Sequence, residues 1–157
     1  MRRILVLNGP NLSSLGRREP EVYGDAELGA IEADVRERAG ALGLEVRFVQ
    51  SNHEGALIDV LEEERDRSHA CIVNPGGLSH TSVVLLDALR AFPGPVVEVH
   101  LSNVHARQPY RRVLLTAEAA EGVISGLGPH VYALALEAVA HMLDARPRAD
   151  APLERMA

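Results

Sequence analysis

The sequence predicts an α/β fold, in which a parallel β-sheet is covered by helices on both faces. Two observations support this prediction. Short apolar runs alternate along the chain with segments whose apolar residues recur at helical spacing. The first run, residues 4–7, is continuously apolar, which is typical of a strand buried on both faces. A length of 157 residues with 46% hydrophobic content is enough for one compact domain with its own core.

Each apolar run is interpreted as a strand, which gives strands at residues 4–7, 44–49, 70–73, 95–99 and 122–125. Helical periodicity lies between or after them, at residues 25–42, 54–65, 80–92 and 131–143. Asp25 is the expected cap of the first helix, and Gly43 is its expected end. Ser79 or Thr81 is expected to begin the third. Helices between successive strands favour a flavodoxin-like parallel sheet with the strand order 2-1-3-4-5.

The chain is expected to form one cytoplasmic domain that does not enter a membrane. Residues 1–145 show neither an internal repeat nor a linker, and residues 146–157 lack periodicity, which predicts a disordered C-terminal tail. The run at residues 4–7 is too short for a signal-peptide core or a membrane span. Cys71, the only cysteine, lies in an apolar run, where a buried and inert thiol in a reducing compartment is expected.

Charge and residue usage exclude several classes of function. The net charge is −6 and the arginines are scattered, so the basic patch of a nucleic-acid-binding protein is absent. The chain contains no lysine, since all 16 basic side chains are arginines. This excludes Schiff-base catalysis by lysine, pyridoxal phosphate attachment and a P-loop. Arginine stays charged and binds carboxylates in a bidentate manner, which suits anchoring or electrostatic help.

Polar residues gather where the predicted strands end, which is the edge at which open α/β sheets bind ligands. The first strand runs into Asn8, the third into Asn74 and the fourth into His100, and glycines follow the fifth. The sequence therefore predicts a polar pocket at this edge. Neither a carboxylate cluster nor the Cys and His spacing of a metal site occurs there, so no metal is expected.

The fourth predicted strand carries a carboxylate and an imidazole on one face. Glu98 and His100 are two residues apart, so strand alternation places their side chains together. A carboxylate beside an imidazole fixes its tautomer and favours the protonated ring, which is suited to general acid catalysis. The alternative is a solvated edge strand with an incidental Glu–His pair.

The loop of residues 8–25 holds a tyrosine in an unusual setting. Three tyrosines and two phenylalanines are the only aromatic residues, yet Tyr23 stands among Arg, Glu, Pro and Gly. A guanidinium such as that of Arg18 favours negative charge on a nearby phenol, which can then act as a general base. The alternative is a lid tyrosine that packs on a neighbouring segment.

Four stretches together closely resemble the type II 3-dehydroquinate dehydratases. They are LNGPNLSSLGRREPEVYG (residues 7–24), QSNHEGALID (50–59), NPGGLSHTSVVLLDAL (74–89) and VVEVHLSNVHAR (96–107). The resemblance implies a flavodoxin-like fold and a hydro-lyase of the shikimate pathway. Such an enzyme converts 3-dehydroquinate to 3-dehydroshikimate by anti elimination through an enolate, without a Schiff base, metal or cofactor. The absence of lysine agrees, because the unrelated class of dehydroquinase depends on a lysine imine.

The resemblance also implies residue roles. Tyr23 would be the base that removes the C2 proton, with Arg18 favouring its phenolate. His100 would protonate the departing C1 hydroxyl, oriented by Glu98, and Asn74 would hold the substrate and a water that stabilises the enolate. The other residues that would bind substrate or shape the pocket are Asn11, His80, Asp87, Leu101, Ser102, Arg107 and Arg111. Among these, Asp87 would reach the site of a neighbouring subunit in a dodecamer built from trimers.

Simpler roles exist for several of these residues taken singly. Asn74 could be a turn residue before a proline, His80 a first-turn residue, and Asp87 the partner of Arg90 in a local ion pair. The chain also departs from the family pattern at Ser13, at residues 113–117 and at Val131. An inactive relative, or a non-catalytic flavodoxin-like module that binds a small ligand, is the alternative function.

Overall fold

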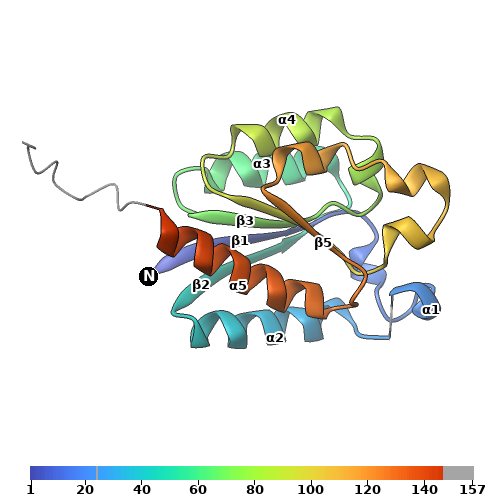
Figure 1. Ribbon diagram of the computed structural model, residues 1–157, viewed down its shortest axis with the longest axis horizontal. Coiled ribbons are helices and arrows are strands. Elements are labelled where there is room, and N and C mark those ends of the chain that lie inside the picture. Colours follow the sequence, from blue (N-terminus) through green and yellow to red (C-terminus); the bar gives the residue numbers. More distant parts are fainter. Residues whose placement is uncertain (24, 147–157) are drawn as a thin grey trace, which may run out of the picture.

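Within residues 1–23 and 25–146, which the computed structural model describes, five parallel strands form one sheet (Figure 1). The strands are β1 (Arg2–Asn8), β2 (Leu44–Gln50), β3 (Ala70–Asn74), β4 (Val96–His100) and β5 (Gly122–Ser125). Their order is β2-β1-β3-β4-β5, so the predicted order 2-1-3-4-5 is confirmed. Asn8 lies opposite Asn74 in the register of β1 with β3. The carboxyl ends of the central strands therefore meet at one edge.

Helices cover both faces of this sheet (Figure 1). The α-helices are α1 (Pro20–Tyr23), α2 (Leu28–Ala41), α3 (Glu54–Glu64), α4 (Val83–Ala91) and α5 (His130–Ala145). Short 3-10 helices are η1 (Leu12–Ser14), η2 (Gly76–His80), η3 (Val104–Ala106), η4 (Pro109–Arg112) and η5 (Thr116–Ala119). Helices α2 and α5 pack together on one face, and α3 and α4 pack together on the other. Most of the 3-10 helices lie in the segments that follow β1, β3 and β4.

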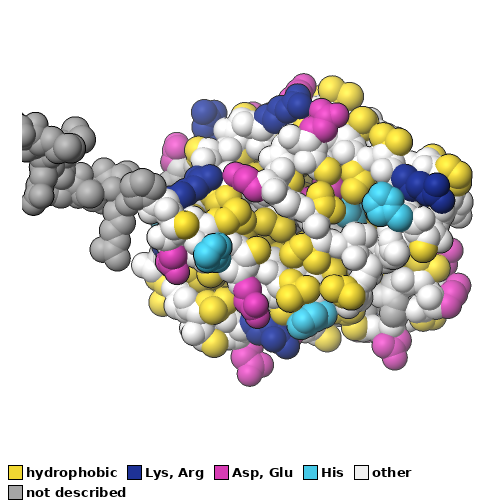
Figure 2. All heavy atoms as spheres, in the orientation of Figure 1, with side chains coloured by type: hydrophobic (Ala, Val, Ile, Leu, Met, Phe, Trp, Pro, Cys, Tyr) yellow, Lys and Arg dark blue, Asp and Glu magenta, His cyan; other side chains and the backbone are white. Residues whose placement is uncertain are grey.

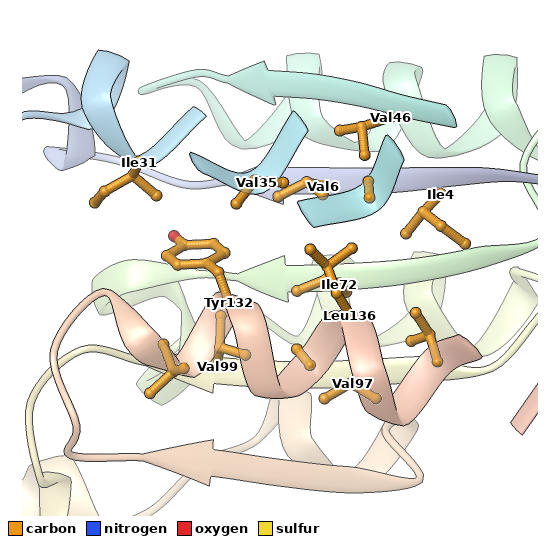
Figure 3. Close-up of a cluster of buried hydrophobic side chains, with 14 of the residues drawn as sticks. Ile4, Val6, Ile31, Val35, Val46, Ile72, Val97, Val99, Tyr132 and Leu136 are labelled. Atoms are coloured by element: carbon orange, nitrogen blue, oxygen red, sulfur yellow. The ribbon is translucent and has the colours of Figure 1, made fainter. Parts of the chain in front are cut away.

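Alternating residues of β1 enter two separate parts of the core. Ile4 and Val6 pack in the cluster between the sheet and helices α2 and α5, which Figure 3 shows with Tyr132 and Leu136 of α5. Leu5 and Leu7 point the other way, into the cluster under α3 and α4. Each of these four β1 side chains is at most 1% exposed. Burial on both faces explains why the run is continuously apolar.

Two predicted helix starts are wrong. Helix α4 begins at Val83, because residues 76–80 form η2 and the Ser82 hydroxyl caps the helix by accepting from the Leu85 N–H at 3.0 Å. Neither Ser79 nor Thr81 is this cap. Helix α2 begins at Leu28, after Glu27, so Asp25 does not cap it.

Other local expectations agree with the structure. Gly43 follows α2 with a φ of 69°, the left-handed conformation that suits glycine at a helix end. Cys71 is fully buried, and burial raises the pKa of its thiol, as expected for an inert side chain. The tail predicted at residues 146–157 lies outside the described residues except for Arg146. Among the described helices, none has the length and apolar character needed to cross a bilayer.

Gly94 provides a test of the packing before β4. A Cβ added there would overlap the carbonyl group of His69, and the overlap is with backbone that cannot rotate away. We expect Gly94→Ala to lower the free energy of unfolding by about 1–3 kcal/mol, as overpacking does. Urea denaturation monitored by circular dichroism measures this change.

Gly40 in α2 is the matched control, because a Cβ there meets nothing within 4 Å. Gly40→Ala should raise the free energy of unfolding by roughly 0.5–1 kcal/mol, through the helix propensity of alanine. Equal effects of the two substitutions would contradict the proposed overlap at Gly94.

Candidate active site

A pocket of about 230 Å³ opens at the carboxyl edge of the sheet. Its walls come from the segments that follow β1, β3 and β4, as expected for an open α/β sheet. The sequence-predicted residues that line it are Asn11, Arg18, Tyr23, Asn74, His80, His100, Leu101, Ser102, Arg107 and Arg111. Two others stand apart. Glu98 lies behind His100, and Asp87 on α4 is not among the lining residues in the described part of the chain.

The Glu98–His100 pair forms as strand alternation predicts. His100 Nε2 is 2.8 Å from Glu98 Oε2, and the two residues are 6% and 0% exposed. Because β4 pairs with both β3 and β5, the alternative of a solvated edge strand is wrong. Nε2 serves Glu98, so Nδ1 is the ring nitrogen that can serve a bound molecule.

The other oxygen of this carboxylate has a partner that sequence reasoning missed. The Thr116 hydroxyl, fully buried in η5, donates to Glu98 Oε1. Both carboxylate oxygens therefore accept a hydrogen bond inside the protein. In the sequence, the spacing of Thr116 from Glu98 carries no periodic signal.

Two arginines lie beside the Tyr23 ring. The guanidinium carbon of Arg18 is 5.3 Å from the ring centroid, and that of Arg107 is 5.1 Å from it. Both cations are within the distance at which a guanidinium group makes a cation–π interaction with an aromatic ring. Arg18 Nε also lies 3.8 Å from Glu19 Oε2, in an exposed ion pair that is screened by solvent. The tyrosine thus meets positive charge from two loops, one after β1 and one after β4.

Asn74 is held by a buried chain of hydrogen bonds. Its Nδ2 donates to the Tyr132 hydroxyl at 3.0 Å, and that hydroxyl donates to Asn8 Oδ1 at 2.6 Å. Asn8 Nδ2 in turn donates to the carbonyl of Val49 at 3.1 Å, and Asn74 Oδ1 accepts from the Gly76 N–H at 3.3 Å. These partners fix which way each amide points.

Tyr132 was not predicted as part of the site. It lies in the helical pattern of α5 among apolar residues, a position that predicts an ordinary core residue. In the structure it is 1% exposed. Burial raises the pKa of its hydroxyl, so Tyr132 remains a neutral phenol that both donates and accepts. Its role is to orient amides, and it does not line the pocket.

The segment after β4 is hydrogen-bonded to the segment that follows β3. His80 Nδ1 is 2.8 Å from the Val113 carbonyl, which can only accept, so Nδ1 carries the hydrogen. The Leu115 N–H donates to the Ser79 carbonyl at 2.7 Å. Residues 113–115 are therefore fixed against η2, which carries His80 of the pocket.

The lining is cationic and suits an anionic small molecule. Arg18, Arg107 and Arg111 line the pocket together with two imidazoles, and no carboxylate is among the lining residues described. Guanidinium groups bind carboxylates well. Across residues 1–23 and 25–146, no group of three or more His, Cys, Asp or Glu side chains could hold a metal ion.

Comparison with known proteins gives one consistent result. The sequence model of the family described as dehydroquinase class II matches residues 2–140. The 3-dehydroquinate dehydratase of Chelativorans sp. (strain BNC1) is 54% identical over 143 residues, covering 90% of this chain and 99% of the relative. That of Mesorhizobium japonicum is 49% identical over 144 residues, covering 91% and 100%.

Solved structures agree. The type II dehydroquinase from Propionibacterium acnes superimposes with a TM-score of 0.87 at 37% identity, covering 90% of this chain and 97% of the other. The type II dehydroquinase from Butyrivibrio crossotus gives a TM-score of 0.86 at 36% identity, covering 88% and 97%.

Tyr132→Phe tests the chain of hydrogen bonds behind Asn74. The substitution keeps the ring but removes the hydroxyl, which leaves the amides of Asn8 and Asn74 each without one buried partner. We expect a loss of about 1–3 kcal/mol in the free energy of unfolding. Urea denaturation measures it, with Tyr110→Phe as the control because Tyr110 is 60% exposed. Equal stability of the two variants would contradict the role given to Tyr132.

Proposed function

The chain belongs to the class II dehydroquinase family, and we propose that it dehydrates 3-dehydroquinate to 3-dehydroshikimate, a hydro-lyase step of the shikimate pathway. One observation of the site carries this proposal. A single pocket brings together a tyrosine flanked by two arginines and a histidine held by a buried carboxylate. Elimination of water needs these two groups, a base and an acid.

Tyr23 is the base in the proposed mechanism. Its phenolate removes the proton from C2 of the substrate, and the electron pair forms an enolate with the neighbouring C3 carbonyl. Arg18 and Arg107, both near 5 Å from the ring centroid, support the negative phenolate before the transfer. Asn74 holds the substrate and a water that stabilises the enolate oxygen. Its amide is already oriented by Tyr132 and Gly76, so little reorganisation is needed.

His100 is the acid in the second half of the reaction. It gives a proton to the C1 hydroxyl, the C1–O bond breaks, and water leaves as the enolate collapses to the conjugated enone. Glu98 compensates the charge of the protonated ring and holds its orientation from behind. The base, Tyr23, lies on the segment after β1, and the acid, His100, lies at the end of β4. In the proposed mechanism they act on opposite faces of the substrate ring, as anti elimination requires.

The remaining residues of the pocket bind the substrate. We assign the substrate carboxylate to the backbone N–H groups of Leu101 and Ser102, and its ring hydroxyls to His80 and Arg111. Asn11 and Arg107 shape the pocket and its cover. Arg107 is braced by a 3.3 Å hydrogen bond to the Ser102 hydroxyl, and Arg111 by one of 3.1 Å to Gln108. The reaction as written uses no metal or cofactor.

We further propose that the chain works as a homo-oligomer, a dodecamer built from trimers. Asp87 is exposed on α4 and does not line the pocket of its own chain. Beside it, Val83 and Val84 are 57% and 49% exposed. Figure 2 shows a further gathering of apolar side chains over β5 and α5, where Val123 is 42% exposed. Large exposed apolar areas of this kind are typical of subunit contacts.

The same proposal places the enzyme in the cytoplasm as a single catalytic domain over residues 1–145. A lone, fully buried cysteine suits a reducing compartment. The alternative of an inactive or non-catalytic module is not favoured, because the catalytic positions are filled and the relatives carry the dehydratase name.

The activity is tested by adding 3-dehydroquinate to the purified protein and following the ultraviolet absorbance of the conjugated enone. We expect the absorbance to rise, at the same rate with and without a strong chelator. No rise with the wild-type protein would overturn the proposed function, and loss of the rise with chelator would overturn the metal-free mechanism.

Tyr23→Phe and Arg18→Ala should nearly abolish turnover while circular dichroism stays unchanged. Near wild-type activity of Tyr23→Phe would remove Tyr23 from the role of base.

Subunit mixing tests the assignment of Asp87. Tyr23→Phe and Asp87→Asn chains, each of low activity alone, are unfolded together and refolded as mixed oligomers. Some pockets then combine an intact Tyr23 with an intact Asp87 from a neighbouring chain, so we expect activity to recover above that of either variant refolded alone. Native mass spectrometry identifies the oligomer and, with one variant carrying a heavy-isotope label, verifies mixing. Mixed oligomers without recovered activity would contradict the shared site.

A further inference from the structure

We propose that Thr116 is a positioning residue for catalysis, which fixes the Glu98 carboxylate so that Glu98 can fix His100. This inference rests on the proposed dehydration, in which His100 is the acid. It adds a member to the site that neither strand alternation nor the resemblance to the family assigns. Thr116 does not line the pocket, so it acts on the reaction only through Glu98.

The observation that carries the proposal is the geometry around one buried carboxylate. Glu98 is 0% exposed, with His100 Nε2 on Oε2 and the Thr116 hydroxyl on Oε1. An ionised carboxylate only accepts, so the Thr116 hydroxyl is the donor in this bond. A buried carboxylate with one oxygen unpaired is costly. Thr116 removes that cost at the oxygen that His100 does not use.

The segment that carries Thr116 is itself held by hydrogen bonds on both sides of this residue. Before it, the Leu115 N–H donates to the Ser79 carbonyl at 2.7 Å. After it, Glu121 forms two bonds with Val96 at the start of β4, from its N–H to the Val96 carbonyl at 2.9 Å and from the Val96 N–H to its carboxylate at 2.6 Å. The segment that carries Thr116 is thus pinned to the loop after β3 and to β4.

Fixing both oxygens determines how the imidazole is presented to the substrate. A carboxylate held at one oxygen can turn about its terminal bond, and the ring bonded to it follows. With Oε1 held by Thr116, Oε2 has one position, and the plane of His100 is set against the pocket. Loss of the hydroxyl should therefore disturb the proton transfer more than the binding of substrate, since the binding contacts come from other residues.

Thr116→Val and Thr116→Ser separate this role from packing. Valine fills nearly the same volume but cannot donate, whereas serine keeps the hydroxyl and loses a methyl group. We expect Thr116→Val to lower kcat roughly tenfold, the order of one hydrogen bond to a charged group, with KM within about twofold of wild type. Thr116→Ser should keep kcat within about threefold. Thr81→Val is the matched control, because Thr81 is the only other threonine and is exposed.

A double-mutant cycle with Glu98→Ala shows whether Thr116 acts through Glu98, because alanine removes the oxygen that accepts from the Thr116 hydroxyl. In the Glu98→Ala background, Thr116→Val should reduce kcat much less than it does in the wild-type background, because the interaction is already absent. Equal reductions in both backgrounds would overturn the proposal, as would an unchanged kcat of Thr116→Val or a Thr116→Ser as slow as Thr116→Val. If Thr116→Val does not fold, Thr116→Ala, which also cannot donate, replaces it under the same criteria.

The two levels of the proposal fail in different ways. A wild-type protein that does not turn over 3-dehydroquinate overturns the dehydratase function itself. An active wild-type protein with an equally active Thr116→Val variant overturns only the role of Thr116.

Discussion

The site depends on one pair of buried hydrogen bonds that joins two strand ends through a side chain of α5. Tyr132 of α5, which follows Asn8 by 124 residues, links Asn8 at the end of β1 to Asn74 at the end of β3. The register of β1 with β3 places these two asparagines side by side, and the helix supplies the hydroxyl that satisfies both. Because all three side chains are buried, no water replaces a lost partner cheaply. A change in how α5 packs on the sheet would therefore also change the positions of the two strand ends and the orientation of the Asn74 amide.

The group around the proposed acid, His100, is also held by buried hydrogen bonds between distant segments. Its central member is a carboxylate, whereas the members linked by Tyr132 are amides. Glu98 is buried in the middle of the sheet, and such a carboxylate persists only when its partners compensate it. His100 from its own strand and Thr116 from the next segment provide this compensation. Each of the two groups thus takes two members from strands and a third from an element that comes later in the chain. The pocket is assembled only when the late segments have packed.

This division explains what the sequence could predict and what it could not. Strand positions and the Glu98–His100 pair follow from local periodicity, which is set by neighbouring residues. Local periodicity does not determine the order of the strands, and the confirmed order was predicted from the alternation of strands and helices along the chain. Tyr132 and Thr116 were missed because their partners are set by packing between distant elements, and each residue type also suits an ordinary buried position. The start of α4 was misplaced for a related reason. Three hydroxyl residues stand within residues 79–82, and the 3-10 helix η2 includes Ser79 and is followed directly by Thr81, so Ser82 is the cap of α4.

Tyr23 shows how a residue can meet two demands that the sequence presents as alternatives. Its ring packs against the core cluster that contains Leu12 and Leu15, which are 6% and 4% exposed and anchor the loop. Tyr23 also lines the pocket, and the guanidinium groups of Arg18 and Arg107 lie near its ring. A tyrosine can do both, because it combines an apolar ring with a polar hydroxyl. Packing against the core therefore does not compete with the proposed chemical use of the phenol, because this packing fixes the ring beside the pocket and near two cations.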